Sequence, residues 1–179
     1  DGYNGGKLTA KGTSSVEYYF APMEGITGAE YRAVHHRHFP GVDRYYMPFI
    51  TPTQDRVFTP RELRNIAPER NVGYCAVPQL LTKNAGDFNW AAGELWAVGY
   101  DEVNLNLGCP SGTVTAKGKG AGMLADLEGL DCFLDGIFSA ARGKISVKTR
   151  LGLRDPEEIF PLLERFARYP ISLLILHPR

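Results

Sequence analysis

The chain has 179 residues, of which 44% are hydrophobic and 22% are charged, and its 20 basic and 20 acidic side chains cancel to a formal net charge of zero. This composition is typical of a globular protein and argues against disorder. No apolar run approaches the ~18 residues that a membrane span requires, so we expect no membrane partner. The zero balance also removes the simplest argument for nucleic-acid binding, a globally basic surface.

The first stretch of the chain, residues 1–16, is mostly polar and rich in glycine. It has neither an apolar segment nor a cleavage-site pattern, so it predicts a flexible extension rather than a signal peptide. Residues 17–179 are then expected to form the folded part, whose length suits one domain or a portion of a larger one.

Six short apolar segments of strand length follow, rich in β-branched, aromatic or leucine residues and ended by polar residues, glycine or proline. Each is predicted to be a strand. In chain order they are Tyr18–Met23, Arg44–Ile50, Tyr74–Leu81, Glu102–Leu107, Lys144–Arg150 and Ser172–His177.

Helical patterns fill the gaps between these strands. Apolar residues recur at helical spacing, and capping residues mark several starts. The strongest start is the sequence Asp-Pro-Glu-Glu at 155–158, which offers an N-cap, a proline at the first position and acids that suit the helix dipole. The predicted helices run from a Thr27 cap to about His38, from an Asn84 cap to just before Gly99, over Leu124–Arg142, and onward from Asp155.

The alternation of strands and helices predicts an α/β fold with parallel strands. A doubly wound sheet and a (β/α)8 TIM barrel both have this rhythm. The phosphate-binding pattern GxGxxG is absent after the first strand, which favours the barrel. A complete barrel needs eight units, and about six β/α units are present, so we expect an incomplete TIM barrel.

The fourth predicted strand carries the most informative chemistry. Asn104 and Asn106 alternate with apolar residues, whereas a purely structural parallel strand is almost entirely apolar. An unpaired buried amide costs roughly 1–3 kcal/mol, so both asparagines need partners. Cys109 follows on a Gly-Cys-Pro turn, which favours a reactive thiol. Cys75 and Cys132 lie within apolar stretches and are expected to be small core residues.

The three cysteines include no CxxC pair, so neither a disulfide framework nor a zinc site is expected. This cysteine usage predicts a reduced, cytoplasmic protein. His35, His36 and His38 fall within four residues, but adjacent helical positions point in different directions. We therefore expect no metal site there.

The fifth predicted strand places Lys148 and Arg150 on one face. Two cations cannot both be buried without partners, which favours an anionic cofactor beside them. The preceding loop over residues 115–122 is rich in glycine and carries Lys117 and Lys119, a composition suited to approaching a phosphate backbone.

Five motifs appear in order from about residue 18 to the end of the chain. They are APMEGIT at 21–27, VPQLL at 77–81, NLNLGCPSGTVTAKGKGAGMLA at 104–125, KTRLG at 148–152 and HPR at 177–179. This set resembles the tRNA-dihydrouridine synthase family, and the GCP block with its Lys/Gly continuation is the most specific part.

The resemblance implies an FMN-binding barrel and a C-terminal helical domain. Such proteins use NADPH to reduce FMN and then reduce the 5,6 double bond of selected uridines in tRNA. On this sequence Cys109 would be the general acid. The cofactor would contact Pro22, Met23, Gln79, Lys148 and His177, and the RNA substrate would contact Asn106, Lys117, Lys119 and Arg150.

Two alternatives stay open from the residues. One is another FMN-dependent barrel oxidoreductase, related to dihydroorotate dehydrogenases or ene-reductases. The other is an inactive, truncated fragment, because the last two strands and the helical domain of the family are expected to be absent. The cysteine loop followed by Lys117 and Lys119 favours the RNA enzyme.

Overall fold

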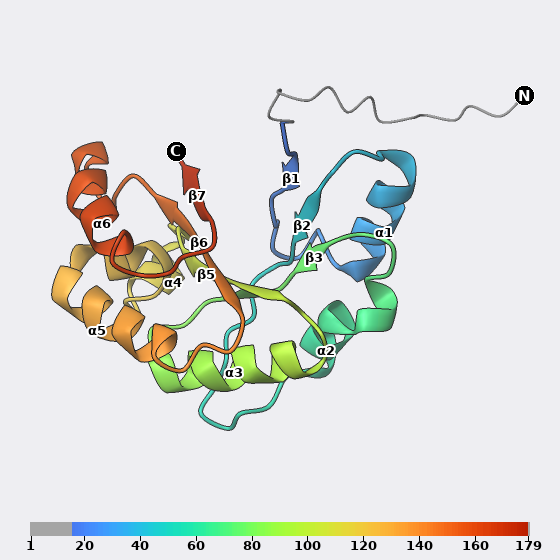
Figure 1. Cartoon of the computed structure of the whole chain (residues 1–179), viewed down its shortest axis with the longest axis horizontal. Helices are drawn as coiled ribbons and strands as arrows, with labels where there is room; N and C mark the ends of the chain where they lie inside the picture. Colours follow the sequence, from blue (N-terminus) through green and yellow to red (C-terminus); the bar gives the residue numbers. More distant parts are fainter. Residues whose placement is uncertain (1–15, 179) are drawn as a thin grey trace, which may run out of the picture.

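The computed structural model describes residues 16–178 (Figure 1). The predicted extension over residues 1–16 lies outside this range, apart from Val16. Strands and helices alternate, and every strand pairing is parallel, which confirms the α/β class. None of the helices in the described range has the length and apolar content that crossing a membrane demands.

The strands form two parallel sheets that follow the six predicted segments. One sheet has the order β1-β2-β3 and the other the order β4-β5-β6-β7. The predicted bounds Glu102–Leu107 and Lys144–Arg150 are those of β5 and β6. The other strands are β1 (Tyr19–Phe20), β2 (Arg44–Tyr46), β3 (Ala76–Val77), β4 (Gln79–Leu80) and β7 (Leu174–His177).

The third predicted strand is divided into β3 and β4 at Pro78, because proline has no N–H to donate to a neighbouring strand. The Pro78 carbonyl still accepts the Asn104 N–H at 2.8 Å. Ile50 bridges the division, since its N–H donates to the Gln79 carbonyl and its carbonyl accepts the Leu81 N–H, both at 2.8 Å. The two sheets thus join into one arc of parallel strands, as an incomplete (β/α)8 barrel requires.

Helices surround the arc, and β1 and β7 form its two ends (Figure 1). Two predicted caps are confirmed. Asn84 accepts the Asp87 N–H at 3.0 Å, and Asp155 accepts the Glu157 N–H at 2.9 Å. The α-helices are α1 (Ala29–His38), α2 (Pro60–Ile66), α3 (Ala85–Ala97), α4 (Gly112–Thr115), α5 (Leu127–Phe138) and α6 (Ile159–Phe166), and the 3-10 helices are η1 (Pro68–Arg70), η2 (Gly120–Ala125) and η3 (Pro156–Glu158).

Thr27 does not cap the first helix, contrary to the prediction. Gly28 occupies the N-cap position of α1 and provides no side-chain cap. The Thr27 hydroxyl instead accepts the Met23 N–H at 2.9 Å and donates to the Met23 carbonyl at 3.1 Å. The prediction was wrong because this hydroxyl closes the loop that carries Met23, which lies before the helix.

The helix predicted over Leu124–Arg142 is shorter at both ends. Asp126 caps it by accepting the Gly129 N–H at 2.9 Å, so α5 begins at Leu127 and ends at Phe138. The residues before Asp126 form η2 instead. A side-chain acceptor inside the predicted range therefore set the true start.

The short helix α2 was not predicted, although its start signal is present. Thr59 and Glu62 form a reciprocal capping box, and Pro60 takes the first helical position. A threonine followed three residues later by a glutamate is the recognised sequence pattern of such a box.

The hydrophobic core lies between the strands and the helices. Apolar and polar positions alternate along β5 and β6, and the apolar set packs against α3, α5 and α6. The polar set therefore faces the inside of the arc. The buried apolar residues are Val103, Leu105, Leu107, Ile145 and Val147 from the strands, Phe88, Ala91, Ala92 and Leu95 from α3, Leu130, Phe133, Leu134 and Ile137 from α5, and Leu162 and Phe166 from α6.

Cys75 and Cys132 are exposed, so the expectation that they are core residues was wrong. Cys132 lies on α5 between the buried positions Leu130 and Phe133, and turns to the solvent face of the helix. Successive helical positions point in different directions, so an apolar sequence neighbourhood alone does not bury a residue.

A buried arginine ties the loop after β1 to the region of α2 and η1. Arg32 is fully buried and has no carboxylate partner among the described residues. Its guanidinium donates to the carbonyls of Thr27 at 2.7 Å and Asn65 at 2.8 Å, and to Asn71 Oδ1 at 2.7 Å. Since Thr27 in turn holds Met23, Arg32 fixes the loop that carries the predicted cofactor contacts.

Replacing Arg32 with methionine should lower the free energy of unfolding by about 2–4 kcal/mol, because buried acceptors lose their donor. The matched control is Arg37→Met, at an exposed position of the same helix, which should change stability by less than about 0.5 kcal/mol. Urea unfolding of the two variants measures the difference. Equal stability of both variants would contradict this role of Arg32.

Candidate active site

Strand register brings the predicted polar residues together on the inner face of the arc. Parallel neighbours in register share a face, and the carboxyl ends of the strands meet at one rim. The lower layer contains Gln79, Asn104 and Ser146, the next contains Asn106 and Lys148, and the rim contains Arg150 and His177.

Three buried side-chain amides form a continuous chain of hydrogen bonds across β4, β5 and β6. Asn106 Nδ2 donates to Gln79 Oε1, and Gln79 Nε2 donates to Asn104 Oδ1, each at 2.8 Å. Asn104 Nδ2 then donates to Ser146 Oγ at 2.8 Å. The partners that the two asparagines required are therefore protein side chains.

The Cys109 loop is held from two sides. Asn106 Oδ1 accepts the N–H groups of Gly108 at 3.1 Å and Cys109 at 2.9 Å. On the other side the Cys109 carbonyl accepts the Ala121 N–H at 3.0 Å. The thiol is half-buried, in keeping with a reactive group presented on a fixed turn.

The glycines of the segment after Cys109 have an internal packing role, which the sequence interpretation missed. A Cβ on Gly120 would lie 2.9 Å from the Cys109 carbonyl oxygen, and one on Gly122 would lie 2.8 Å from the Thr115 carbonyl oxygen. Gly120 also has a φ of +56°, which favours glycine. The glycine content therefore lets this segment pack against the cysteine loop, and need not reflect phosphate binding.

The two predicted lysines of this segment are accessible, and a third cation lies near them. Lys117 is exposed and Lys119 is half-buried. A Cβ on Gly118 would lie 3.6 Å from the ammonium nitrogen of Lys83. Lys83 therefore reaches the same turn from the segment that follows β4. Sequence reasoning missed Lys83 because it follows an apolar strand with no basic neighbour.

Lys148 is half-buried and forms no hydrogen bond or ion pair with another side chain in residues 16–178. Burial lowers its pKa, the positive charge of Arg150 lowers it further, and Cys109 opposes the shift. An unpaired, partly desolvated cation beside a thiol favours an anionic or carbonyl-bearing ligand.

The remaining predicted contacts lie at the edges of this group. Pro22 is half-buried and Met23 is exposed, both following β1 on the other sheet. His177 is exposed at the end of β7, where its Cα pairs with that of Arg150. The fold thus brings Gln79, Asn106, Cys109 and Lys148 into one group, whereas Pro22 and Met23 make no hydrogen bond to it among the described residues.

No three acidic, histidine or cysteine side chains within residues 16–178 gather as a metal site would require. Two of the three histidines near the end of α1 pack on aromatic rings. His35 lies against Phe20 with ring centroids 4.5 Å apart, and His36 against Tyr74 at 5.2 Å.

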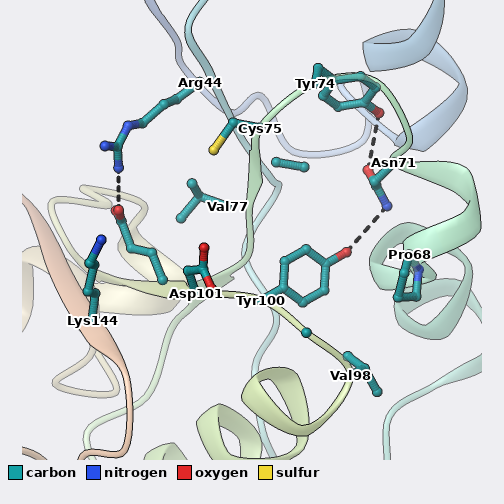
Figure 2. Close-up of a pocket in the computed structure, with 13 residues that line it drawn as sticks. Arg44, Pro68, Asn71, Tyr74, Cys75, Val77, Val98, Tyr100, Asp101 and Lys144 are labelled. Atoms are coloured by element: carbon teal, nitrogen blue, oxygen red, sulfur yellow. Dashed lines mark hydrogen bonds and ion pairs between the residues drawn. The ribbon is translucent and has the colours of Figure 1, made fainter.

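A cavity of about 320 Å³ lies at the opposite, amino ends of the strands (Figure 2). Arg44 there forms an ion pair with Glu102, and Asn71 hydrogen-bonds the hydroxyls of Tyr74 and Tyr100 at 3.1 Å and 3.4 Å. Active sites of parallel barrels lie at the carboxyl ends of the strands, so this cavity is separate from the candidate site.

The fold and the grouped side chains define a partial (β/α)8 domain with its candidate site at the carboxyl ends of the strands. A family model described as dihydrouridine synthase (Dus) matches residues 19–179. The chain belongs to the dihydrouridine synthase family, which confirms the expected resemblance and the barrel fold.

Curated relatives carry related names. The probable tRNA-dihydrouridine synthase 1 of Synechocystis sp. is 27% identical over 161 residues, which cover 89% of this chain and 44% of the relative. The tRNA-dihydrouridine(16) synthase of Ralstonia nicotianae is 29% identical over 167 residues, covering 89% and 51%. The tRNA-dihydrouridine(20/20a) synthase of Shewanella oneidensis is 38% identical over 68 residues, covering 38% and 20%. The chain spans about half the length of the first two relatives.

Substituting alanine at Gly120 should displace the Cys109 loop, because the new Cβ meets the Cys109 carbonyl and the left-handed backbone alone costs roughly 1–3 kcal/mol. Gly112→Ala is the matched control, since a Cβ there meets nothing within 4 Å. Thermal unfolding should show a loss of stability for the Gly120 variant alone. A Gly120 variant as stable as the control would refute the packing role.

Replacing Lys148 with methionine should raise the melting temperature of the protein without added ligand, because a partly desolvated cation is removed. The folded state lowers the pKa of Lys148, so the unfolded state binds the proton more tightly. The gain from methionine should be fully present below the lowered pKa and fade as pH rises towards the ordinary lysine value. Thermal melts between neutral and alkaline pH measure this, and a destabilised variant at neutral pH would contradict it.

Proposed function

We propose that this protein reduces selected uridines of tRNA to 5,6-dihydrouridine, with FMN as cofactor and NADPH as reductant. The observation that carries the proposal is the Cys109 loop, whose backbone N–H is held by Asn106 at the carboxyl end of β5, close enough to Lys148 for Cys109 to influence the pKa of that lysine. Membership of the dihydrouridine synthase family favours this reaction over that of another FMN-dependent barrel oxidoreductase.

The donors on the inner face suit the polar edge of a flavin ring. Gln79 Nε2 uses one hydrogen on Asn104 and keeps a second, and Lys148 keeps all three. The carbonyl oxygens of a flavin ring, and its ring nitrogen when negatively charged, accept hydrogen bonds from such donors. Pro22 and Met23 would add apolar contacts to the ring, and His177 would approach from β7. FMN, when bound, would supply the hydride that reaches C6 of the uracil.

The chain's own residues then complete the reduction. The thiol of Cys109 would donate the proton that C5 requires, because it lies on a loop above the carboxyl ends of the strands. Asn106 Oδ1 already accepts two backbone N–H groups, so its amide can only donate to the base. A uracil carbonyl oxygen accepts such a bond, whereas the amino group of cytosine cannot.

The tRNA would be held by cations around the rim. Lys117 and Lys119, joined by Lys83 at the Gly118 turn, suit contacts to the phosphate backbone. Arg150 lies two residues beyond Lys148 on the same face of β6 and would also contact the RNA. The target uridine has to leave its stack to reach Cys109, as enzymes that act on bases require.

Replacing Cys109 with alanine should lower the rate of tRNA reduction about 10²–10⁴-fold, the usual contribution of a general acid, while FMN stays bound. Cys132→Ala is the matched control, because that thiol is exposed on α5 and should leave the rate unchanged. Dihydrouridine is quantified by mass spectrometry of digested tRNA, and FMN by absorbance. Near-normal turnover of the Cys109 variant would refute its role.

A further inference from the structure

Asn104 and Ser146 lie in the lower layer of the inner face, one layer below Asn106 and Lys148. Both are fully buried, and Gln79, which pairs with Asn104 in the same layer, is 1% exposed. Asn104 and Ser146 do not reach the rim, where cofactor and base would bind. Each nevertheless belongs to the chain of hydrogen bonds that ends at the cysteine loop. Their amide and hydroxyl groups therefore bear on the site only through Gln79 and Asn106.

The direction of every bond in this chain is fixed from its loop end. The backbone N–H groups of Gly108 and Cys109 can only donate, so the atom of Asn106 that faces them must be its oxygen. Asn106 therefore presents its nitrogen to Gln79, and Gln79 presents its nitrogen to Asn104. Turning any one amide over would place two donors or two acceptors face to face.

At the opposite end of this chain of hydrogen bonds, the terminal groups act as hydrogen-bond acceptors. Asn104 Nδ2 donates to Ser146 Oγ, next to the buried hydroxyl of Tyr46. Burial raises the pKa of Tyr46, the Glu102 carboxylate raises it further, and hydrogen bonding with Ser146 opposes the shift. Tyr46 therefore stays protonated and donates to Glu102 at 3.3 Å, whose charge Arg44 balances in the ion pair marked in Figure 2.

We propose that Asn104 and Ser146 are positioning residues of the active site. By accepting from Gln79, Asn104 holds that amide so that it offers only N–H groups to a ligand. Through Gln79 it also keeps Asn106 under the Cys109 loop, and Ser146 holds Asn104 in turn. The identity of the ligand rests on the proposed function, but the coupling of Asn104 to the Cys109 loop does not.

The coupling is measured by the alkylation rate of Cys109 with iodoacetamide in the full chain prepared without flavin, resolved by peptide mass spectrometry. Cys75 and Cys132 are exposed and serve as internal references. Asn104→Leu leaves the Gln79 donor unpaired and should accelerate alkylation of Cys109 about tenfold over the references. Asn104→Asp still accepts from Gln79 and should keep the rate of the unmodified chain.

A matched control separates coupling from general loosening. Thr149→Val removes a buried hydroxyl from the opposite face of β6, whose only side-chain bond in the described chain is to the Arg150 carbonyl at 3.2 Å. It should leave Cys109 alkylation unchanged. An equal acceleration by Thr149→Val, or none by Asn104→Leu, would overturn the proposal.

Double substitution tests the route itself. If the effect passes through Gln79, Asn104→Leu should add nothing to the alkylation rate of a Gln79→Leu chain, whereas an independent structural effect would multiply the two rates. Ser146→Ala, a smaller change, should accelerate alkylation in the same direction and by less. A double variant whose acceleration equals the product of the two single accelerations would overturn the route. Because no reduction of tRNA is measured, these outcomes are distinct from failure of the proposed function.

Discussion

The lower layer inside the strand arc is polar and buried, and this constraint shapes the rest of the structure. Asn104 and Ser146 are fully buried, so no water reaches them and each polar atom needs a partner from a neighbouring strand. The in-register pairing of β4, β5 and β6 supplies those partners across the arc. A slip of one residue between two strands would move these amides to the apolar face and the leucines to the inner face. The chain of amide hydrogen bonds therefore also specifies the register.

The same register explains why the site lies at the carboxyl ends of the strands. Above the amide chain lie Lys148, the Gly108–Cys109 loop and Arg150, and neither of the two cations forms an ion pair within residues 16–178. Lys148 keeps an unsatisfied charge at the level of Asn106, while the amino ends close with the Arg44–Glu102 ion pair. The buried charges are thus paired at the amino ends of the strands, whereas the positive charge of Lys148 stays available near their carboxyl ends.

Buried side chains and one glycine position the two loops that carry Met23 and Cys109. Arg32 and Thr27 fix the loop after β1, and Gly120 lets the following segment pack directly on the Cys109 carbonyl. Neither role concerns a ligand directly. Both restrict where a side chain at the rim can lie, as the proposed proton transfer from Cys109 would require.

The sequence alone was sufficient for the parallel α/β fold and the bounds of β5 and β6, because alternation and turn residues are local signals. The roles of Cys109 and Lys148 stay predictions. Tertiary structure decided the rest. That Cys132 faces solvent depends on the direction of a helix face, and that Asn104 binds Gln79 depends on segments 25 residues apart in sequence. Hydrogen-bond partners between strands are set only when register is set, and no periodicity within one strand contains that information.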